Sequence, residues 1–250
     1  MPRIDALTVV WYANPRDVST ESDAVDALLV VLNEHLPEAL PVNFEASGHE
    51  ASTRRFTWLD RASLHDVATV EGNVQWTTKD PFIQGYIFGL GWKPERRGTP
   101  VVEATVALNM QALSNPEFEG RLLEAFPRAA AALDAFYGVA QADYGVIQDG
   151  SEIGSDMQSR VAGRSVTDGM GWLGLPRRSV SFEWLGSRYM RAVDETVVAR
   201  GTLAGGGLLL RYRNDAERAS TLPHELLVGI TPSGRPKPAQ LLPHSFQSPP

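Results

Sequence analysis

Cysteine is absent from this sequence of 250 residues, and its absence excludes several kinds of chemistry. Without thiols the chain cannot form disulfides, thiolate metal sites or iron–sulfur clusters, and it has no cysteine nucleophile. A chain of this length buries enough surface to fold without such cross-links. The absence also removes one usual sign of secretion, so we expect a cytoplasmic protein.

Long apolar runs are missing as well. The run at residues 6–12 (ALTVVWY) is too short for the core of a signal peptide. No stretch approaches the ~18 consecutive apolar residues of a membrane span. We therefore expect an untargeted protein with no membrane partner.

Basic residues are outnumbered by acidic ones, and the formal net charge is −7. Only three lysines occur (Lys79, Lys93 and Lys237), against twenty arginines. Nonspecific nucleic-acid binding needs a basic face, because Lys and Arg must displace condensed counterions. The paired arginines at 54–55, 96–97 and 177–178 are isolated, so we expect no nucleic-acid partner.

Recognisable catalytic and cofactor motifs are also lacking. The chain contains no G-x-S-x-G, S-x-x-K or H-E-x-x-H pattern, and none of its five histidines stand three or four residues apart. The glycines at 205–207 have no following Lys-Ser or Lys-Thr, so they predict a hairpin turn and not a phosphate loop. We predict no catalytic residue, no metal ligand and no cofactor, although residues that meet only in the fold escape such a search.

Hydrophobic periodicity predicts strands and two helices in the first part of the chain. Residues 6–12 are β-branched and aromatic and predict a buried strand. Apolar positions at helical spacing predict a helix from about residue 20 to 36, which Pro37 ends. Residues 82–92 and 101–108 predict a hairpin. Asn115-Pro116-Glu117 starts a second helix, which we expect to continue to a cap at Gly138.

The rest of the sequence shows shorter and less regular hydrophobic patterns. Residues 149–171 are polar and glycine-rich, and residues 180–184 alternate as a strand would. Residues 232–250 hold six prolines and no acidic residue, which is typical of an extended tail. The expected organisation is an α+β half with two amphipathic helices (1–148), a linker or surface loop (149–171), a smaller α+β half (172–231) and the tail (232–250). The fold class is α+β, with antiparallel sheets and packed helices, and two ferredoxin-like halves are one arrangement of that kind.

Five residues are candidates for contact with a partner. Trp58 and Trp172 have polar or glycine-rich neighbours, so we predict that they lie outside the core, where tryptophan carries much interface energy. Asp149, Glu152 and Asp156 belong to an acidic stretch that lacks the ligand spacing of a calcium-binding EF-hand. We assign these five side chains to partner binding.

Three motifs in the second half resemble those of a known family. They are Gly171-Trp172-Leu173, Trp184-Leu185-Gly186-x-x-Tyr189 and Gly205-Gly206-Gly207-Leu208-Leu209-Leu210-Arg211. Together with the early strand, amphipathic helix and aromatic-glycine hairpin of the first half, they are similar to the type VI secretion immunity-like protein family, over about half of the chain. The resemblance implies a cytoplasmic protein that binds and blocks a cognate toxin without catalytic residues of its own.

The favoured function is therefore a non-enzymatic binding protein, an immunity protein whose protein partner is a cognate bacterial toxin. Two alternatives stay open. One is an enzyme whose site is assembled from dispersed Asp, Glu, Arg and His residues. The other is a phage or structural assembly protein, whose proline-rich tail docks on a neighbouring subunit. The oligomeric state is open as well.

Overall fold

A computed structural model describes most of the chain. The described residues are 3–14, 21–46, 53–89, 101–149, 152–154, 167–168, 171–176, 180–230, 232, 236–237 and 239–241.

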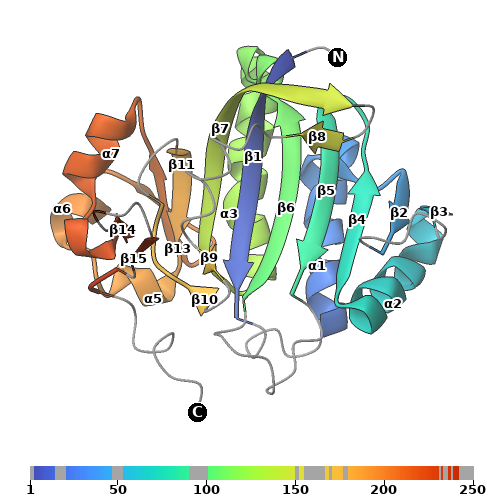
Figure 1. The fold of residues 1–250 in the computed structure, drawn as a ribbon, viewed down its shortest axis with the longest axis horizontal. Helices are drawn as coiled ribbons and strands as arrows, with labels where there is room; N and C mark the ends of the chain where they lie inside the picture. The colour runs from blue at the N-terminus through green and yellow to red at the C-terminus, as the bar shows by residue number, and fades with distance from the viewer. Residues whose placement is uncertain are drawn as a thin grey trace.

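One large antiparallel sheet organises the fold, and with its packed helices it confirms the predicted α+β class (Figure 1). The eleven strands are β1 (Arg3–Ala13), β2 (Asn43–Glu45), β3 (Arg54–Arg55), β4 (Asn73–Thr77), β5 (Phe82–Phe88), β6 (Val102–Asn109), β7 (Ala135–Asp149), β8 (Glu152–Gly154), β11 (Val180–Leu185), β12 (Thr202–Ala204) and β13 (Gly207–Arg211). Their order is β12-β13-β11-β7-β1-β6-β5-β4-β2-β3, and β8 pairs with β7 beside this path. Two further pairs are β9 (Thr167–Asp168) with β10 (Gly171–Trp172) and β14 (Gly229–Ile230) with β15 (Pro236–Lys237).

The helices lie around this sheet. They are α1 (Glu21–His35), α2 (Arg61–Glu71), α3 (Pro116–Ala132), α5 (Ser187–Met190), α6 (Glu195–Val198) and α7 (Asp215–Thr221). Short 3-10 helices are η1 (Pro37–Ala39), η3 (Trp58–Asp60), η4 (Met110–Ser114) and η5 (His224–Leu226). Within the described part of the chain, no helix is long and apolar enough to cross a membrane.

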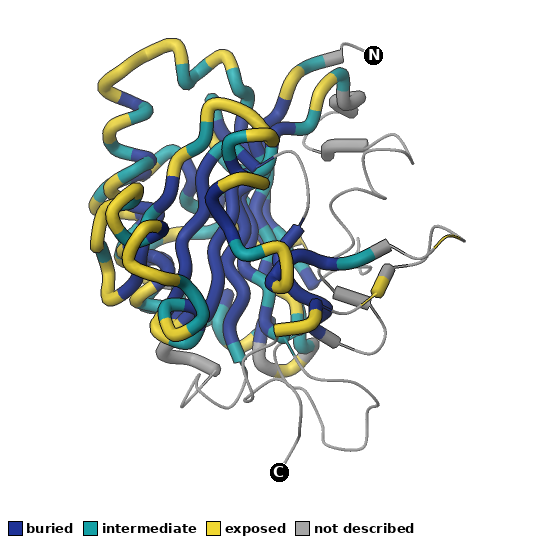
Figure 2. The backbone as a smooth tube through the Cα atoms, turned by 90° about the vertical axis from the view of Figure 1, so that its left-hand side faces the viewer, coloured by how far each residue is buried: buried dark blue, intermediate teal, exposed yellow. Residues whose placement is uncertain are grey.

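The first hydrophobic core lies between one face of the sheet and the helices α1 and α3 (Figure 1). Alternate residues of a strand point to the same side, so Leu7, Val9 and Trp11 of β1 all enter this core. The indole Nε1 of Trp11 donates a hydrogen bond to the carbonyl oxygen of Phe126, at 3.0 Å. Figure 2 shows the strands buried in the middle of the molecule.

Helix α3 begins as predicted but ends earlier. The Asn115 side chain accepts a hydrogen bond from the backbone N–H of Glu117, at 3.0 Å. The expectation that the helix continues to Gly138 is wrong, because α3 ends at Ala132 and β7 begins at Ala135. Strand β7 pairs with β1 on one side and β11 on the other, and this two-sided pairing outweighs the helical spacing of the sequence. Gly138 is not a cap: its missing side chain makes room for the Phe126 ring.

The second core lies on the opposite face of the sheet. Apolar side chains of β7, β11 and β13 pack there against the C-terminal segments, including Trp172, Tyr189 and Leu226. Because β11 pairs directly with β7, one sheet runs across the predicted boundary between the halves. The division at 1–148, 149–171, 172–231 and 232–250 stays a prediction.

A buried ion pair holds the C-terminal segments to the sheet. Arg218 of α7 and Glu183 of β11 are both fully buried, with Nη2 2.8 Å and Nε 3.0 Å from the carboxylate oxygens. The hydroxyls of Tyr137 and Tyr212 also donate to Glu183, so the carboxylate accepts four hydrogen bonds. Arg218 donates a further bond to the carbonyl oxygen of Pro176. Burial disfavours the charged guanidinium, but the charge and hydrogen bonds of Glu183, together with Tyr137 and Tyr212, outweigh this effect and raise the pKa of Arg218.

Substitution Arg218→Met tests this ion pair. It leaves the Glu183 carboxylate buried without its cation, which typically lowers the free energy of unfolding by about 3–5 kcal/mol. Arg213→Met is the control, because Arg213 makes an exposed ion pair with Glu217 beside the same helix, and we expect no resolved change. Urea unfolding followed by tryptophan fluorescence measures both. Equal stability of the two variants would contradict the proposed role of the pair.

Candidate functional site

Polar side chains line up across the face of the sheet opposite to α1 and α3. Glu45 of β2 stands opposite Gln75 of β4, Gln75 opposite Tyr86 of β5, and Tyr86 opposite Thr105 of β6. Since adjacent strands lie about 4.8 Å apart, this row spans about 14 Å. Together with Glu103, Thr8 and Asp143, which extend it over β6, β1 and β7, these side chains form what we call the polar face.

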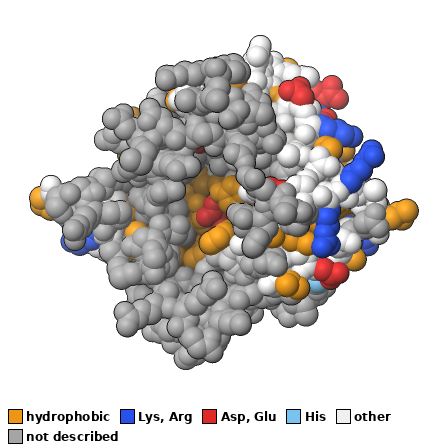
Figure 3. Space-filling view, turned by 45° about the vertical axis from the view of Figure 1, so that its right-hand side comes forward, with side chains coloured by type: hydrophobic (Ala, Val, Ile, Leu, Met, Phe, Trp, Pro, Cys, Tyr) orange, Lys and Arg blue, Asp and Glu red, His pale blue; other side chains and the backbone are white. Residues whose placement is uncertain are grey.

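The polar face adjoins the second core at β1, where Tyr12 stands opposite Glu103 and Val10 opposite Thr105. Helix α5 packs on β7, β11 and β13, and Figure 1 shows α5, α6 and α7 on the other side of β1 from β4, β5 and β6. Viewed from the side of β4 and β5, the surface is hollowed, and an acidic side chain lies among hydrophobic ones in the hollow (Figure 3).

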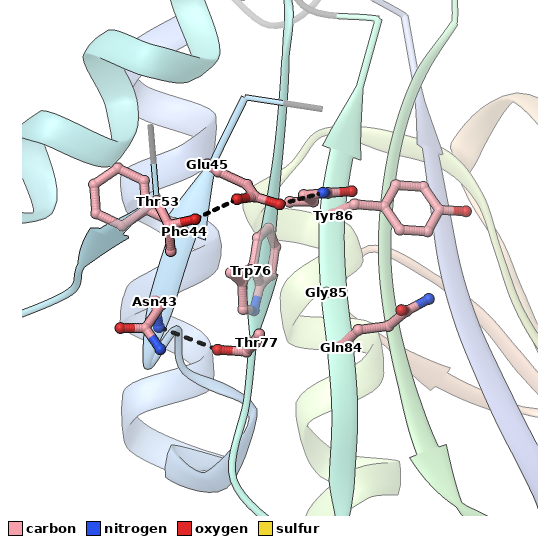
Figure 4. Close-up of a pocket in the computed structure, with 10 residues that line it drawn as sticks. Asn43, Phe44, Glu45, Thr53, Trp76, Thr77, Gln84, Gly85 and Tyr86 are labelled. Atoms are coloured by element: carbon pink, nitrogen blue, oxygen red, sulfur yellow. Dashed lines mark hydrogen bonds between the residues drawn. The ribbon is translucent and has the colours of Figure 1, made fainter. Parts of the chain in front are cut away.

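A pocket of about 270 Å³ opens at the β2 end of the polar face (Figure 4). Its lining is rich in hydrogen-bonding groups. It has three amide side chains (Asn43, Gln75, Gln84), three hydroxyls (Thr53, Thr77, Tyr86) and one carboxylate (Glu45), and Phe44, Trp76 and Gly85 complete it. The ten residues include no Lys, Arg or His.

The Glu45 carboxylate is held in place by two neutral donors. Thr53 Oγ1 donates to Oε2 at 2.6 Å, and Gln75 Nε2 donates to Oε1 at 2.7 Å (Figure 4). These two hydrogen bonds lower the pKa of Glu45, so the group carries its charge at neutral pH.

Gly85 and Trp76 support the pocket from the opposite face of the sheet, where Trp76 belongs to the first core. A Cβ atom at Gly85 would lie 2.2 Å from Cε2 of the Trp76 ring, so a side chain here would displace the indole. Trp76 is anchored in turn, because its Nε1 donates to the carbonyl oxygen of Ala39 at 3.1 Å. The β4–β5 backbone that carries the pocket is therefore packed firmly on the first core.

Two further carboxylates lie along the polar face. The Tyr86 hydroxyl donates to Glu103 Oε1 at 2.6 Å, and Thr8 donates to Asp143 at 3.0 Å. Burial raises the pKa of Glu103, against the opposing hydrogen bonds from Tyr86 and Thr105. Burial also raises the pKa of Asp143, against the hydrogen bond from Thr8. Ionisation of both groups is thus disfavoured by their surroundings.

Trp172 does not lie where the sequence analysis placed it. The prediction that it stands outside the core is wrong, because only 4% of it is exposed. Its Nε1 donates to the Tyr189 hydroxyl at 2.7 Å, and its ring packs against Tyr12 and Phe136. The flanking glycines suggested exposure, but here they accompany an aromatic cluster.

The other four predicted residues are spread over the chain. Trp58 is half-buried in η3, packs against the first core and lies 5.3 Å from the Arg61 guanidinium carbon. Asp149 and Glu152 are register partners at the β7–β8 turn, and Asp156 lies outside the described residues. A role of these residues in partner binding stays a prediction.

The residues of the polar face escaped the sequence analysis. Strand β4 alternates between half-buried and buried residues, so Gln75 and Thr77 share one side of it. However, the pairing of Gln75 with Glu45 joins strands thirty residues apart in sequence, and no local pattern shows this register. Among the described residues, no group of three or more His, Asp or Glu side chains could hold a metal ion.

Comparison with known proteins finds a likeness of structure but none of sequence. No protein-family model matches the sequence, and a search of curated proteins finds no significant match. The structure is similar to that of the Pseudomonas aeruginosa T6SS protein PA0821, with a TM-score of 0.55 and 13% sequence identity. The match covers 84% of this chain, which spans 66% of the length of that protein. At this identity the likeness is one of fold.

The opposite pKa shifts of Glu103 and Glu45 predict opposite effects of neutral substitution. The pKa of Glu103 is higher in the folded state than its ordinary value of 4.5, so the folded protein holds this proton more tightly. The resulting stabilisation is complete below pH 4.5 and is lost as pH rises through the pKa of the folded state. Glu103→Gln should therefore gain stability, relative to the unsubstituted protein, as pH rises above that value. Glu45→Gln should lose relative stability as pH rises from its lowered folded pKa to 4.5. Urea unfolding across this pH range measures both, and pH profiles of the same sign would contradict the assignment.

Proposed function

We propose that this chain is a non-enzymatic immunity protein, which binds a cognate toxin of a type VI secretion system and blocks it. The observation that carries the proposal is the fold likeness to a T6SS protein. The motifs around Trp172, Trp184 and the glycines at 205–207, which resemble the immunity-like family, agree with it. Fold likeness alone is an analogy, so the geometry of the polar face has to supply the mechanism.

The polar face offers a surface for such binding. It combines amide and hydroxyl groups with three carboxylates, of which Glu45 is the one whose charge its surroundings stabilise, and the whole chain has a net charge of −7. A negative surface accelerates encounter with a positively charged partner and disfavours acidic ones. Blocking a toxin needs an interface that covers its working surface, and hydrogen-bonding groups held by a rigid sheet suit that task.

An enzyme is the second candidate, and one observation favours it. Glu103 is a carboxyl group with a raised pKa beside the Tyr86 hydroxyl, and perturbed acids of this kind concentrate at active sites. The neighbouring pocket lining contains one carboxylate and no Arg or His, so the described residues do not assemble there the mixed set that an acid–base site uses.

Co-expression tests the proposed function. The genes next to the one encoding this chain are expressed in a laboratory bacterial host, alone and together with it. We expect one neighbour to arrest growth, this chain to restore it, and the two proteins to co-purify as a complex. The association rate should fall as salt is raised, because charge attraction is screened. Failure of every neighbouring gene product to form a complex would overturn the proposal.

A further inference from the structure

We propose that the pocket at Glu45 receives a single cationic side chain of the partner, an arginine. This inference rests on the proposed function, because it names the chemistry by which the polar face recognises the toxin. It concerns the contact at one end of that face and assigns Glu45 as the anion that the partner neutralises.

The first argument is charge. The pKa of Glu45, ordinarily 4.5, is lowered further by two hydrogen bonds, so the group is ionised at neutral pH. No cation lines the pocket, and among the described residues none forms an ion pair with Glu45. The nearest arginines in the strand register are Arg54, which stands opposite Phe44, and Arg55, which stands opposite Asn43. Within the described part of the chain, a negative charge is thus held in a polar recess without a positive partner.

The second argument is hydrogen bonding. A carboxylate has about four acceptor sites, and Thr53 and Gln75 each use one, on different oxygens. Each oxygen of Glu45 keeps acceptor capacity, which a planar guanidinium can fill with two parallel N–H bonds. The amide and hydroxyl oxygens of the lining can accept the remaining N–H groups, and this favours arginine over lysine.

The third argument is size and rigidity. At about 270 Å³ the pocket falls just below the roughly 300–1,000 Å³ of small-molecule sites. It therefore fits one long side chain better than a cofactor. Thr53 and Gln75 already orient the carboxylate, and Trp76 behind Gly85 supports the backbone. A side chain that enters a preorganised pocket loses less free energy to ordering, so such pockets serve as anchor points in interfaces.

Nuclear magnetic resonance with matched small probes tests the pocket directly. The isotope-labelled full chain is titrated with Nα-acetyl-arginine amide and with its citrulline counterpart, which has the same shape without the charge. We expect saturable shifts at the backbone amides of Thr77, Gln84 and Tyr86 with the arginine probe. Affinity for the citrulline probe should be at least about tenfold weaker, as expected for a contact made by charge-assisted hydrogen bonds.

Two carboxyl-to-amide variants complete the test. Glu45→Gln should abolish saturable binding of the arginine probe, and its unchanged spectrum elsewhere shows that it folds. Glu34→Gln is the control, because Glu34 is an exposed carboxylate on α1, in the helix layer, and it should bind the probe like the unsubstituted chain. Equal affinity for arginine and citrulline, unchanged binding by Glu45→Gln, or no saturable binding at all would each overturn the inference.

Binding measurements with the cognate toxin distinguish a failure of this inference from a failure of the proposed function. If a complex forms, Glu45→Gln should weaken it at least about tenfold and Glu34→Gln should not, as for a buried interface contact. A complex that Glu45→Gln leaves unchanged overturns the pocket inference and leaves the immunity function standing. Saturable arginine binding without a complex with any neighbouring gene product supports the pocket and overturns the function.

Discussion

The buried ion pair between Arg218 and Glu183 holds the C-terminal segments against one part of the sheet and so separates the covered part of that face from the polar part. It attaches α7 and the segment at Pro176 to β11, and the two tyrosine hydroxyls complete the acceptor sites of the carboxylate. The C-terminal segments therefore cover the β13-β11-β7 side of one face with apolar side chains. The β6-β5-β4-β2 side of that face carries polar side chains instead, and the candidate site lies there.

The polar face holds its carboxylates at some expense of stability. Burial raises the pKa of Glu103 and of Asp143, so the folded state disfavours the charge of both groups. A sheet face selected for stability alone would place neutral or apolar residues at such positions. Glu45 differs, because two neutral donors stabilise its charge. Under the proposed function, the three carboxylates serve recognition of the partner.

Local signals predicted several of the elements, and long-range pairing supplied others. The alternation of β-branched residues in β1, the cap at Asn115 and the glycines at 205–207 each act within a few residues, so sequence patterns show them. The end of α3 was misjudged because β7 gains its stability from strands far away in sequence. The pocket has the same origin: Glu45 and Gln75 meet only through strand register, which a local pattern does not contain.

Carboxyl footprinting of the free protein and of its complex with the cognate toxin tests the central claim most directly. In this measurement, exposed carboxyl groups are modified chemically and the extent of modification is read by mass spectrometry. The account predicts that modification of Glu45 falls in the complex, whereas Glu34 on α1 and Glu124 on α3, in the helix layer, are modified as in the free protein. Protection of Glu34 and Glu124 with unchanged modification of Glu45 would place the partner on the helices and contradict the account.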